Sequence, residues 1–133
     1  MSSPTSRTKK LLEGLGWEID IVERYNSFVR RRFDLFNFAD LLCIAHPNPP
    51  GGLVAVQATS GDHHANRKAK IIANPKALRW LQAGGHIWLI TWSKKTKLLK
   101  SGKISKSKIW APRTEIITED QFDANSLRDT KAA

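Results

Sequence analysis

The sequence predicts a mixed α/β domain, in which helices cover both faces of a central sheet. The chain has 133 residues, of which 41% are hydrophobic, and this is enough for one domain with a real core. Its periodicity predicts elements in the order helix, three strands, helix, strand. The first three strands can form an antiparallel meander, whereas helices separate the third and fourth strands, which we therefore expect to be parallel.

The first part of the chain predicts a helix followed by a strand. Residues 5–15 carry leucines at helical spacing, and Gly14 or Gly16 ends this helix. Residues 17–24 alternate between apolar and charged side chains, as a half-buried strand does. Glu23 shares the parity of the apolar residues, so we expect it to point toward the covered face at the end of the strand.

Two further strands are predicted on either side of a turn. Residues 25–37 mix arginines with phenylalanines and predict an irregular connection or a poorly alternating extended segment. Residues 39–45 form the second strand, and residues 46–52 form a turn because they include three prolines and two glycines. Residues 53–58 are apolar enough to form a central strand.

Helices follow the central strand. Residues 60–62 supply a turn and a cap for a helix over residues 63–73. Asn74 and Pro75 break this helix, and Pro75 suits the first position of another helix, which two glycines end. Residues 86–92 then predict a fourth strand.

The elements together predict a single domain over residues 1–133. Its core spans about residues 8–93, and a lysine-rich hairpin or loop follows at 94–108. A last strand and a short acidic helix, capped by Thr118, complete the domain at 109–128.

The charge of the chain predicts a polyanionic partner, of which nucleic acid is the commonest. The net charge is +10, and no Asp or Glu lies between His63 and Thr114, a stretch that contains thirteen Lys or Arg residues. The alternative is that this stretch is a solvated lysine-rich loop.

The single cysteine, Cys43, excludes an internal disulfide and agrees with a reducing cytoplasm, where we expect the protein to act. Cys43 lies in an apolar run, as a small buried hydrophobic residue does. The polar start of the chain does not resemble a signal peptide, and no apolar run approaches the ~20 residues of a membrane span.

A carboxylate and an amide on neighbouring predicted strands form a candidate metal site. Asp40 begins the second strand, and Gln57 and Thr59 share one face of the third. Carboxylate and amide oxygens suit a hard cation such as Mg²⁺. Glu23 and Asp34 are candidates for a second acidic ligand, although ion pairs with arginines are the more ordinary role for both, and Gln57 is equally compatible with a hydrogen-bonded core amide.

This arrangement resembles the PD-(D/E)XK nuclease superfamily. Phe38-Ala39-Asp40 stands where the family has Pro-Asp, and Gln57-Ala58-Thr59 stands where it has Glu-X-Lys, with glutamine as in Mrr-type nucleases. Residues 8–93 are similar to small phage and prophage nuclease-like proteins. The resemblance implies a restriction-endonuclease-like αβββαβ core and a DNA endonuclease that depends on Mg²⁺ or Mn²⁺. Its relatives include Holliday-junction resolvases, so branched recombination or repair intermediates are among the implied substrates, in a bacterial or phage-infected cell.

The chain departs from the family pattern at Thr59, which replaces the motif lysine. Threonine can hydrogen-bond a water but supplies no cation. Either another basic residue reaches the site or the domain is a catalytically inactive DNA-binding accessory protein. We expect Ala65, Ala69 and Ile72 to face the sheet, so that Arg67 and Lys70 flank that face, and we choose Lys70 as the replacement.

The basic residues are expected to contact the phosphate backbone of DNA. Phosphate contacts alone do not separate DNA from RNA, and the sequence is compatible with a homodimer. We expect His63 and His64 to face DNA and Trp92 to be a candidate for base stacking. The predicted phosphate contacts come from Arg30, Arg31, Arg32, Arg67, Lys68, Lys94, Lys95, Lys97, Lys100 and Lys103.

Overall fold

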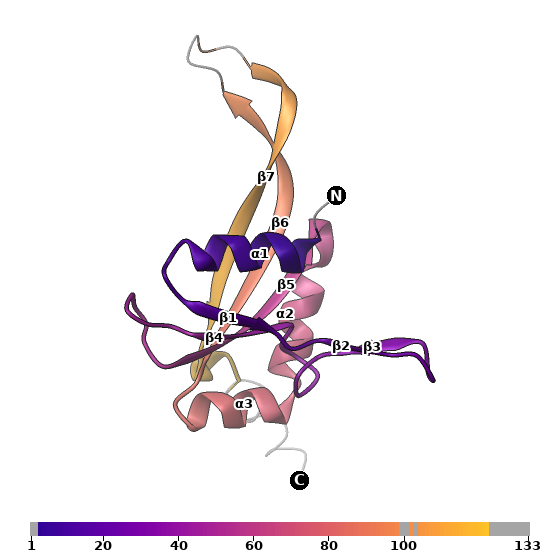
Figure 1. Cartoon of the computed structure of the whole chain (residues 1–133), viewed down its shortest axis with the longest axis vertical. Helices are drawn as coiled ribbons and strands as arrows, with labels where there is room; N and C mark the ends of the chain where they lie inside the picture. Colours follow the sequence, from indigo (N-terminus) through magenta and orange to yellow (C-terminus); the bar gives the residue numbers. More distant parts are fainter. Residues whose placement is uncertain (1–2, 99–101, 103, 123–133) are drawn as a thin grey trace.

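The computed structural model of the chain describes residues 3–98, 102 and 104–122. Five strands form one mixed sheet, and two short strands form a separate hairpin (Figure 1). The elements are α1 (Pro4–Glu13), β1 (Glu18–Ile21), β2 (Arg24–Asn26), β3 (Arg31–Phe33), β4 (Leu41–Ile44), β5 (Leu53–Ser60), the 3-10 turn η1 (Gly61–His63), α2 (His64–Ile72), α3 (Pro75–Gln82), β6 (His86–Leu98) and β7 (Ile104–Ile117).

The sheet has the strand order β1-β4-β5-β6-β7, which confirms the predicted mixture of antiparallel and parallel pairs. Strands β1, β4 and β5 are antiparallel neighbours, as a meander requires. Strand β6 pairs in parallel with β5, and β7 then returns antiparallel to β6. Strand β5 is therefore central, and its residues 54–59 are buried.

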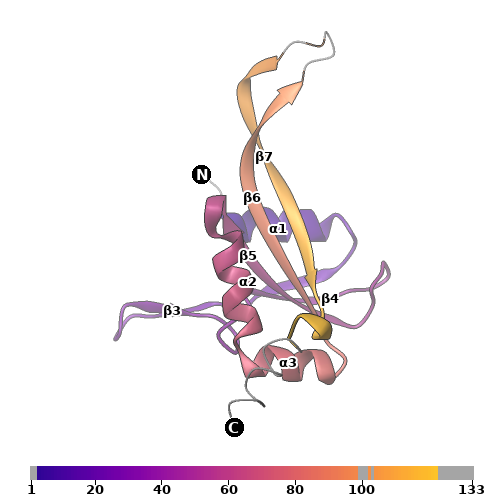
Figure 2. The same cartoon turned by 180° about the vertical axis from the view of Figure 1, so that it is seen from behind.

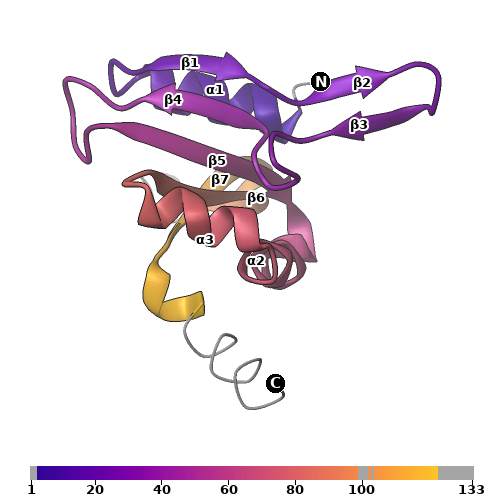
Figure 3. The same cartoon turned by 90° about the horizontal axis from the view of Figure 1, so that it is seen from below.

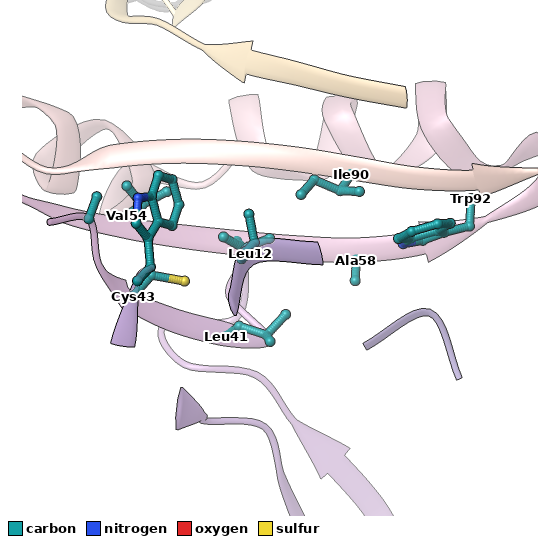
Figure 4. Packing of buried hydrophobic residues seen from close by; sticks show 10 residues of the cluster. Leu12, Leu41, Cys43, Val54, Ala58, Ile90 and Trp92 are labelled. Atoms are coloured by element: carbon teal, nitrogen blue, oxygen red, sulfur yellow. The ribbon is translucent and has the colours of Figure 1, made fainter. Parts of the chain in front are cut away.

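Helices cover the two faces of the sheet, which confirms the predicted layers. Helix α1 lies on one face, and α2 and α3 lie on the other (Figures 2 and 3). Figure 4 shows the apolar cluster on the α1 side, where Leu12 meets side chains of β4, β5 and β6 that include Leu41, Cys43, Val54, Ala58, Ile90 and Trp92. The cluster on the opposite face joins Ile71 of α2 and Ala77 of α3 to the sheet residues Ala55, Ile87, Leu89 and Ile117.

Local sequence explains where two of the helices begin. The Ser3 side chain accepts a hydrogen bond of 3.1 Å from the backbone N–H of Ser6 at the start of α1. At α3 the Asn74 side chain accepts one of 3.0 Å from Lys76 N, and Pro75 takes the first helical position, as predicted. The predicted cap of α2 is wrong, because η1 precedes that helix and no side chain in residues 60–63 makes a capping hydrogen bond.

The predicted strand over residues 17–24 is too long. Strand β1 ends at Ile21, and the chain then leaves the sheet to form the β2–β3 hairpin (Figure 1). Residues 25–33 belong to this hairpin, so the alternative of a poorly alternating extended segment is nearer to the structure than an irregular connection. The pairing of its two strands was not predicted, because they are short and exposed and show no apolar alternation.

The second hairpin, formed by β6 and β7, is longer than predicted. Strand β6 continues from Trp92 to Leu98, and β7 begins at Ile104, so the ladder extends into the lysine-rich segment. The predicted acidic helix is described only at residues 119–122, and residues 123–128 lie outside the described part of the chain. Among the described residues, no helix combines the length and the apolar content that crossing a membrane requires.

Candidate functional site

Asp40 is the central functional candidate, because two groups of β5 hold its carboxylate. It lies immediately before β4 and is only 4% exposed. Its Oδ2 accepts one hydrogen bond of 2.9 Å from Gln57 Nε2 and another of 2.9 Å from the backbone N–H of Ala58. Both bonds end on one oxygen, so β5 fixes the orientation of the carboxyl group without using its second oxygen.

Three carboxyl groups meet at this point. Glu23, Asp34 and Asp40, which we call the acidic cluster, each offer an oxygen, and these atoms lie within 4.8 Å of one another. From the sequence, we expected either Glu23 or Asp34 to be a second acidic ligand. In the structure, both of them lie next to Asp40. A donor set of carboxylate oxygens suits Mg²⁺ or Mn²⁺.

Backbone hydrogen bonds place the members of the acidic cluster. The Asp40 carbonyl accepts bonds of 2.9 and 3.3 Å from the N–H groups of Val22 and Glu23, which locates Glu23 just beyond the end of β1. A tight loop joins Asp34 to Asp40, closed by paired backbone bonds of 2.8 and 3.1 Å between Leu35 and Ala39. Glu23 thus reaches the site from outside the strand, and strand parity was not what placed it there.

Burial, together with the neighbouring carboxyl groups, raises the pKa of Asp40 to about 8. Burial contributes most to this shift, and a hydrogen bond with Asp34 and the negative charges of Asp34 and Glu23 add to it. The hydrogen bond from the backbone of Ala58 acts in the opposite direction. In the absence of a cation, the acidic cluster therefore retains a proton near neutral pH, and a divalent cation would relieve both the repulsion and the burial cost.

Gln57 lies beside the acidic cluster with its amide N–H turned to Asp40. This bond orients the carboxylate, and the predicted role as a metal ligand would need the other amide atom, Oε1. Thr59, two residues further along β5, is also buried and lines the same cavity. Gln57 and Thr59 therefore share one face, as predicted, and both line the cavity that contains Asp40.

The acidic cluster lies in a cavity of about 440 Å³ at the end of β5. Residues 3–5 at the start of α1 form part of its wall. The basic groups at its edge are Arg32, His63 and Arg67. An acidic floor with cations around it can hold a divalent cation below a phosphodiester.

The basic residues of α2 have three different environments. Arg67 lines the cavity, whereas Lys70, the predicted replacement for the motif lysine, is exposed and does not line it. Lys68 forms an ion pair with Glu115 on β7, with 2.6 Å between Nζ and Oε2. Of the three candidate cations on this helix, Arg67 is the one that lines the cavity of the acidic cluster.

His64 anchors α2 to the sheet. The prediction that it faces outward, toward DNA, is therefore wrong. Its Nδ1 lies 2.6 Å from Thr91 Oγ1 and its Nε2 lies 2.7 Å from Glu115 Oε1, while its neighbour His63 is exposed at the cavity. Hydrogen bonds from His64 and Lys68 lower the pKa of Glu115 to about 2. Sequence reasoning overlooked Glu115, although it is the first acid after the long basic stretch.

The expected apolar face of α2 is wrong for its two alanines. Ala65 and Ala69 are exposed, while His64 and Ile71 are the buried residues of this helix. Ile72 is half-buried and packs against the apolar cluster on this face, as expected. Polar residues can occupy inward positions here because Thr91 and Glu115 satisfy them.

The other predicted DNA-binding residues lie on the two hairpins. Arg30, Arg31 and Arg32 are exposed on the β2–β3 hairpin, and Arg32 Nη1 lies 3.4 Å from Glu23 Oε1. Lys94 and Lys95 are exposed on β6, and Lys94 Nζ lies 5.3 Å from the centre of the Trp110 ring. Lys97 belongs to β6, and Lys100 and Lys103 lie outside the described residues.

Trp92 is not available for base stacking, so that prediction is wrong. It is buried in the cluster on the α1 side, and its Nε1 donates a hydrogen bond of 2.8 Å to Thr8 Oγ1. Trp110 is more exposed, but the guanidinium of Arg7 covers its ring at 3.9 Å.

Comparisons with known proteins identify no family for this chain: no family model matches, and neither curated proteins nor solved structures show a significant similarity.

Proposed function

We propose that the protein is a metal-dependent DNA endonuclease that hydrolyses phosphodiester bonds with Mg²⁺ or Mn²⁺. The observation that carries this proposal is the acidic cluster, three carboxyl groups within 4.8 Å of one another, inside the cavity that Arg67 and Arg32 also line. A cluster of acids in a chain of net charge +10 is better explained by a cation site than by general surface charge.

The topology supports a restriction-endonuclease-like core for this proposal. Omitting the β2–β3 hairpin, the chain runs from α1 through the antiparallel strands β1, β4 and β5 to helices and the parallel strand β6. Asp40 precedes the second strand of this series, and Gln57 lies on the third. These are the places that the resemblance to PD-(D/E)XK nucleases assigns to the motif residues.

The chain's own residues would divide the work as follows. Asp40, Asp34 and Glu23 hold the cation, and the Gln57 amide together with the Ala58 N–H keeps Asp40 in place. Arg67 and Arg32 bind phosphate oxygens at the rim of the cavity. A bound Mg²⁺ or Mn²⁺ would supply a Lewis acid and lower the pKa of a water molecule. Thr59 can hydrogen-bond that water but cannot replace the charge of a lysine.

A DNA cleavage assay with matched charge variants tests this proposal. We expect cleavage with Mn²⁺ that EDTA abolishes, and a loss of at least about a hundredfold in Asp40→Asn, given that cluster residues act as a unit. Asp20→Asn is the control, because Asp20 is exposed on β1, does not line the cavity, and undergoes the same replacement of a carboxyl group by an amide. Undiminished cleavage by Asp40→Asn would refute the assignment.

The second candidate is a DNA-binding accessory protein without activity, which the replacement of the motif lysine by Thr59 favours. DNA binding in EDTA that is unaffected by Asp40→Asn, with no cleavage in either metal, would support it. The substitution Thr59→Lys separates the two further: a gain of cleavage would show that the cation is what limits a working site.

A homodimer would place two such sites on one DNA, and sedimentation equilibrium measures whether the protein is a dimer. Parallel assays with RNA decide which nucleic acid is bound.

A further inference from the structure

The β2–β3 hairpin combines positive charge and aromatic rings in one short segment. Residues 24–33, which we call the basic aromatic hairpin, contain four arginines, three aromatic residues and no acid. The hairpin projects beyond the edge of the main sheet (Figures 1 and 3). Isolated two-stranded hairpins are marginal in water, so an exposed one with this composition suggests a surface that meets a partner.

Phe28 occupies the tip of this hairpin and is 97% exposed. The turn that presents it is ordered, since the Asn26 side chain accepts hydrogen bonds of 2.9 Å from Phe28 N and 3.4 Å from Val29 N. Because the side chain is almost fully exposed, the ring offers both of its faces to a flat ligand.

The two faces of the hairpin repeat the pairing of a ring with a cation. Tyr25 pairs with Arg32 across the strands, and Phe33 pairs with Arg24, so each face carries an aromatic and a basic side chain. The Arg31 guanidinium also lies 5.5 Å from the centre of the Phe33 ring. Rings that stack on bases, alternating with cations that meet phosphates, are typical of proteins that bind unpaired nucleic acid.

The hairpin and the acidic cluster are one continuous piece of chain. Glu23 immediately precedes β2, and Asp34 immediately follows β3. Arg32 also touches Glu23, with 3.4 Å between Nη1 and Oε1. Because Phe28 is five residues from Glu23, its backbone lies no more than about 18 Å from that of Glu23. A DNA strand held at the tip therefore has phosphates within reach of the cavity.

We propose that the basic aromatic hairpin binds unpaired DNA bases, with Phe28 as the stacking ring, and so directs the protein to forks and flaps. In a fully paired duplex the faces of the bases are covered by their neighbours, whereas an unpaired base next to a duplex offers a free face. This inference rests on the proposed function, because it names the DNA structure presented to the same cavity. Self-association through this hairpin is disfavoured, because its four arginines would face those of a second copy.

Equilibrium binding in EDTA tests the inference independently of cleavage. Fluorescence anisotropy would compare a forked DNA with a paired duplex of equal length for the full chain and for Phe28→Ala, Phe28→Leu and Ile116→Ala. We expect Phe28→Ala to weaken fork binding at least about fivefold and duplex binding less than about twofold, since one base on one aromatic ring is worth that much or more. Phe28→Leu should lose most of the same affinity, because leucine is apolar but does not stack.

Ile116→Ala is the matched control, since it removes a half-exposed apolar side chain from β7, far along the chain from the hairpin. The inference is overturned if Phe28→Ala loses equally on both DNAs, if it loses nothing, or if Phe28→Leu binds the fork like the unmodified chain. It is also overturned if Phe28→Ala changes the mass in sedimentation, which would make the tip a self-association surface. Cleavage that depends on Asp40 would survive each of these results, so failure of the hairpin and failure of the nuclease are distinguishable.

Discussion

Gln57 and Asp40 lie seventeen residues apart and are joined by a hydrogen bond of 2.9 Å from the Gln57 amide to Asp40 Oδ2. The bond crosses from β5 to the residue that precedes β4, inside the sheet, where both side chains are buried. A neutral amide holds a carboxylate in place without adding charge. Replacing the Gln57 amide by a carboxylate changes the charge of the acidic cluster more than its shape. A substitution at Gln57 therefore tests the electrostatics of the site.

Gln57→Glu should make the protein more dependent on a cation. A fourth carboxyl group adds repulsion to the acidic cluster, so the melting temperature in EDTA should fall by several degrees, as a loss of about 1–2 kcal/mol does in a domain of this size. Addition of Mn²⁺ should then raise it by more than in the unmodified chain. Differential scanning fluorimetry measures both shifts. Gln82→Glu, at the exposed end of α3, is the control, and an equal response of the two variants would contradict the prediction.

Binding of Mn²⁺ should strengthen as the pH rises. The pKa of Asp40 is raised to about 8, chiefly by burial, so a cation must displace a proton below that pH. We expect the apparent affinity to rise by up to about tenfold per pH unit from about pH 6 and to level off above pH 8. Isothermal titration calorimetry in two buffers of different ionisation enthalpy would detect the released proton. A pH-independent affinity would show that Asp40 is already ionised.

Without metal, the same shift should make the protein less stable at high pH. The folded pKa of Asp40 lies above its ordinary value of 3.8, so its contribution is fully present below about pH 4 and is lost as the pH rises through about 8. Urea denaturation in EDTA at about pH 5 and about pH 9 measures this difference. Asp40→Asn should remove most of it, whereas Asp20→Asn should leave it unchanged.

Glu115→Gln should lower the free energy of unfolding by about 1–2 kcal/mol, because it removes the charge that pairs with Lys68 and accepts from His64. The pKa of Glu115 is lowered to about 2, so its contribution is present above about pH 4.5 and is lost as the pH falls through about 2. The difference between variant and unmodified chain should therefore shrink near pH 3 in urea denaturation. Glu119→Gln, an exposed acid after β7, should show neither effect.

Arg67→Ala and Lys70→Ala should separate the two candidates for the replacement cation. Arg67 lines the cavity and Lys70 does not, although both lie on α2 and carry the same charge. We expect Arg67→Ala to reduce cleavage at least about tenfold and Lys70→Ala to reduce it less than about threefold. Single-turnover cleavage rates measure this directly. Equal losses would indicate that α2 contributes only general positive charge.

Much of the sheet could be predicted from the sequence, because strand pairing here follows chain order. The turn over residues 46–52 forces the strands around it to be antiparallel, and the helices after β5 force β6 to be parallel. Asp40 and Gln57 meet for the same reason. Asp40 immediately precedes β4 and Gln57 lies on β5, so the pairing of Leu41 with Val56 in the register of these strands places the two residues opposite each other.

The acidic cluster was only partly predictable. Glu23 and Asp34 flank a hairpin that the apolar pattern does not reveal, and a local loop returns Asp34 to Asp40. The buried face of α2 was also invisible. His64 turns inward because it finds Glu115, fifty-one residues later in the chain.

The sequence by itself determined the order of the strands, the Asp40–Gln57 pair and the basic character of the surface, because these follow from periodicity, turn residues and charge. Only the tertiary structure decided which acids join Asp40, which cation enters the cavity and which aromatic ring stays exposed. The physical reason is that burying a polar group requires a partner, and such partners come from elements that are remote along the chain.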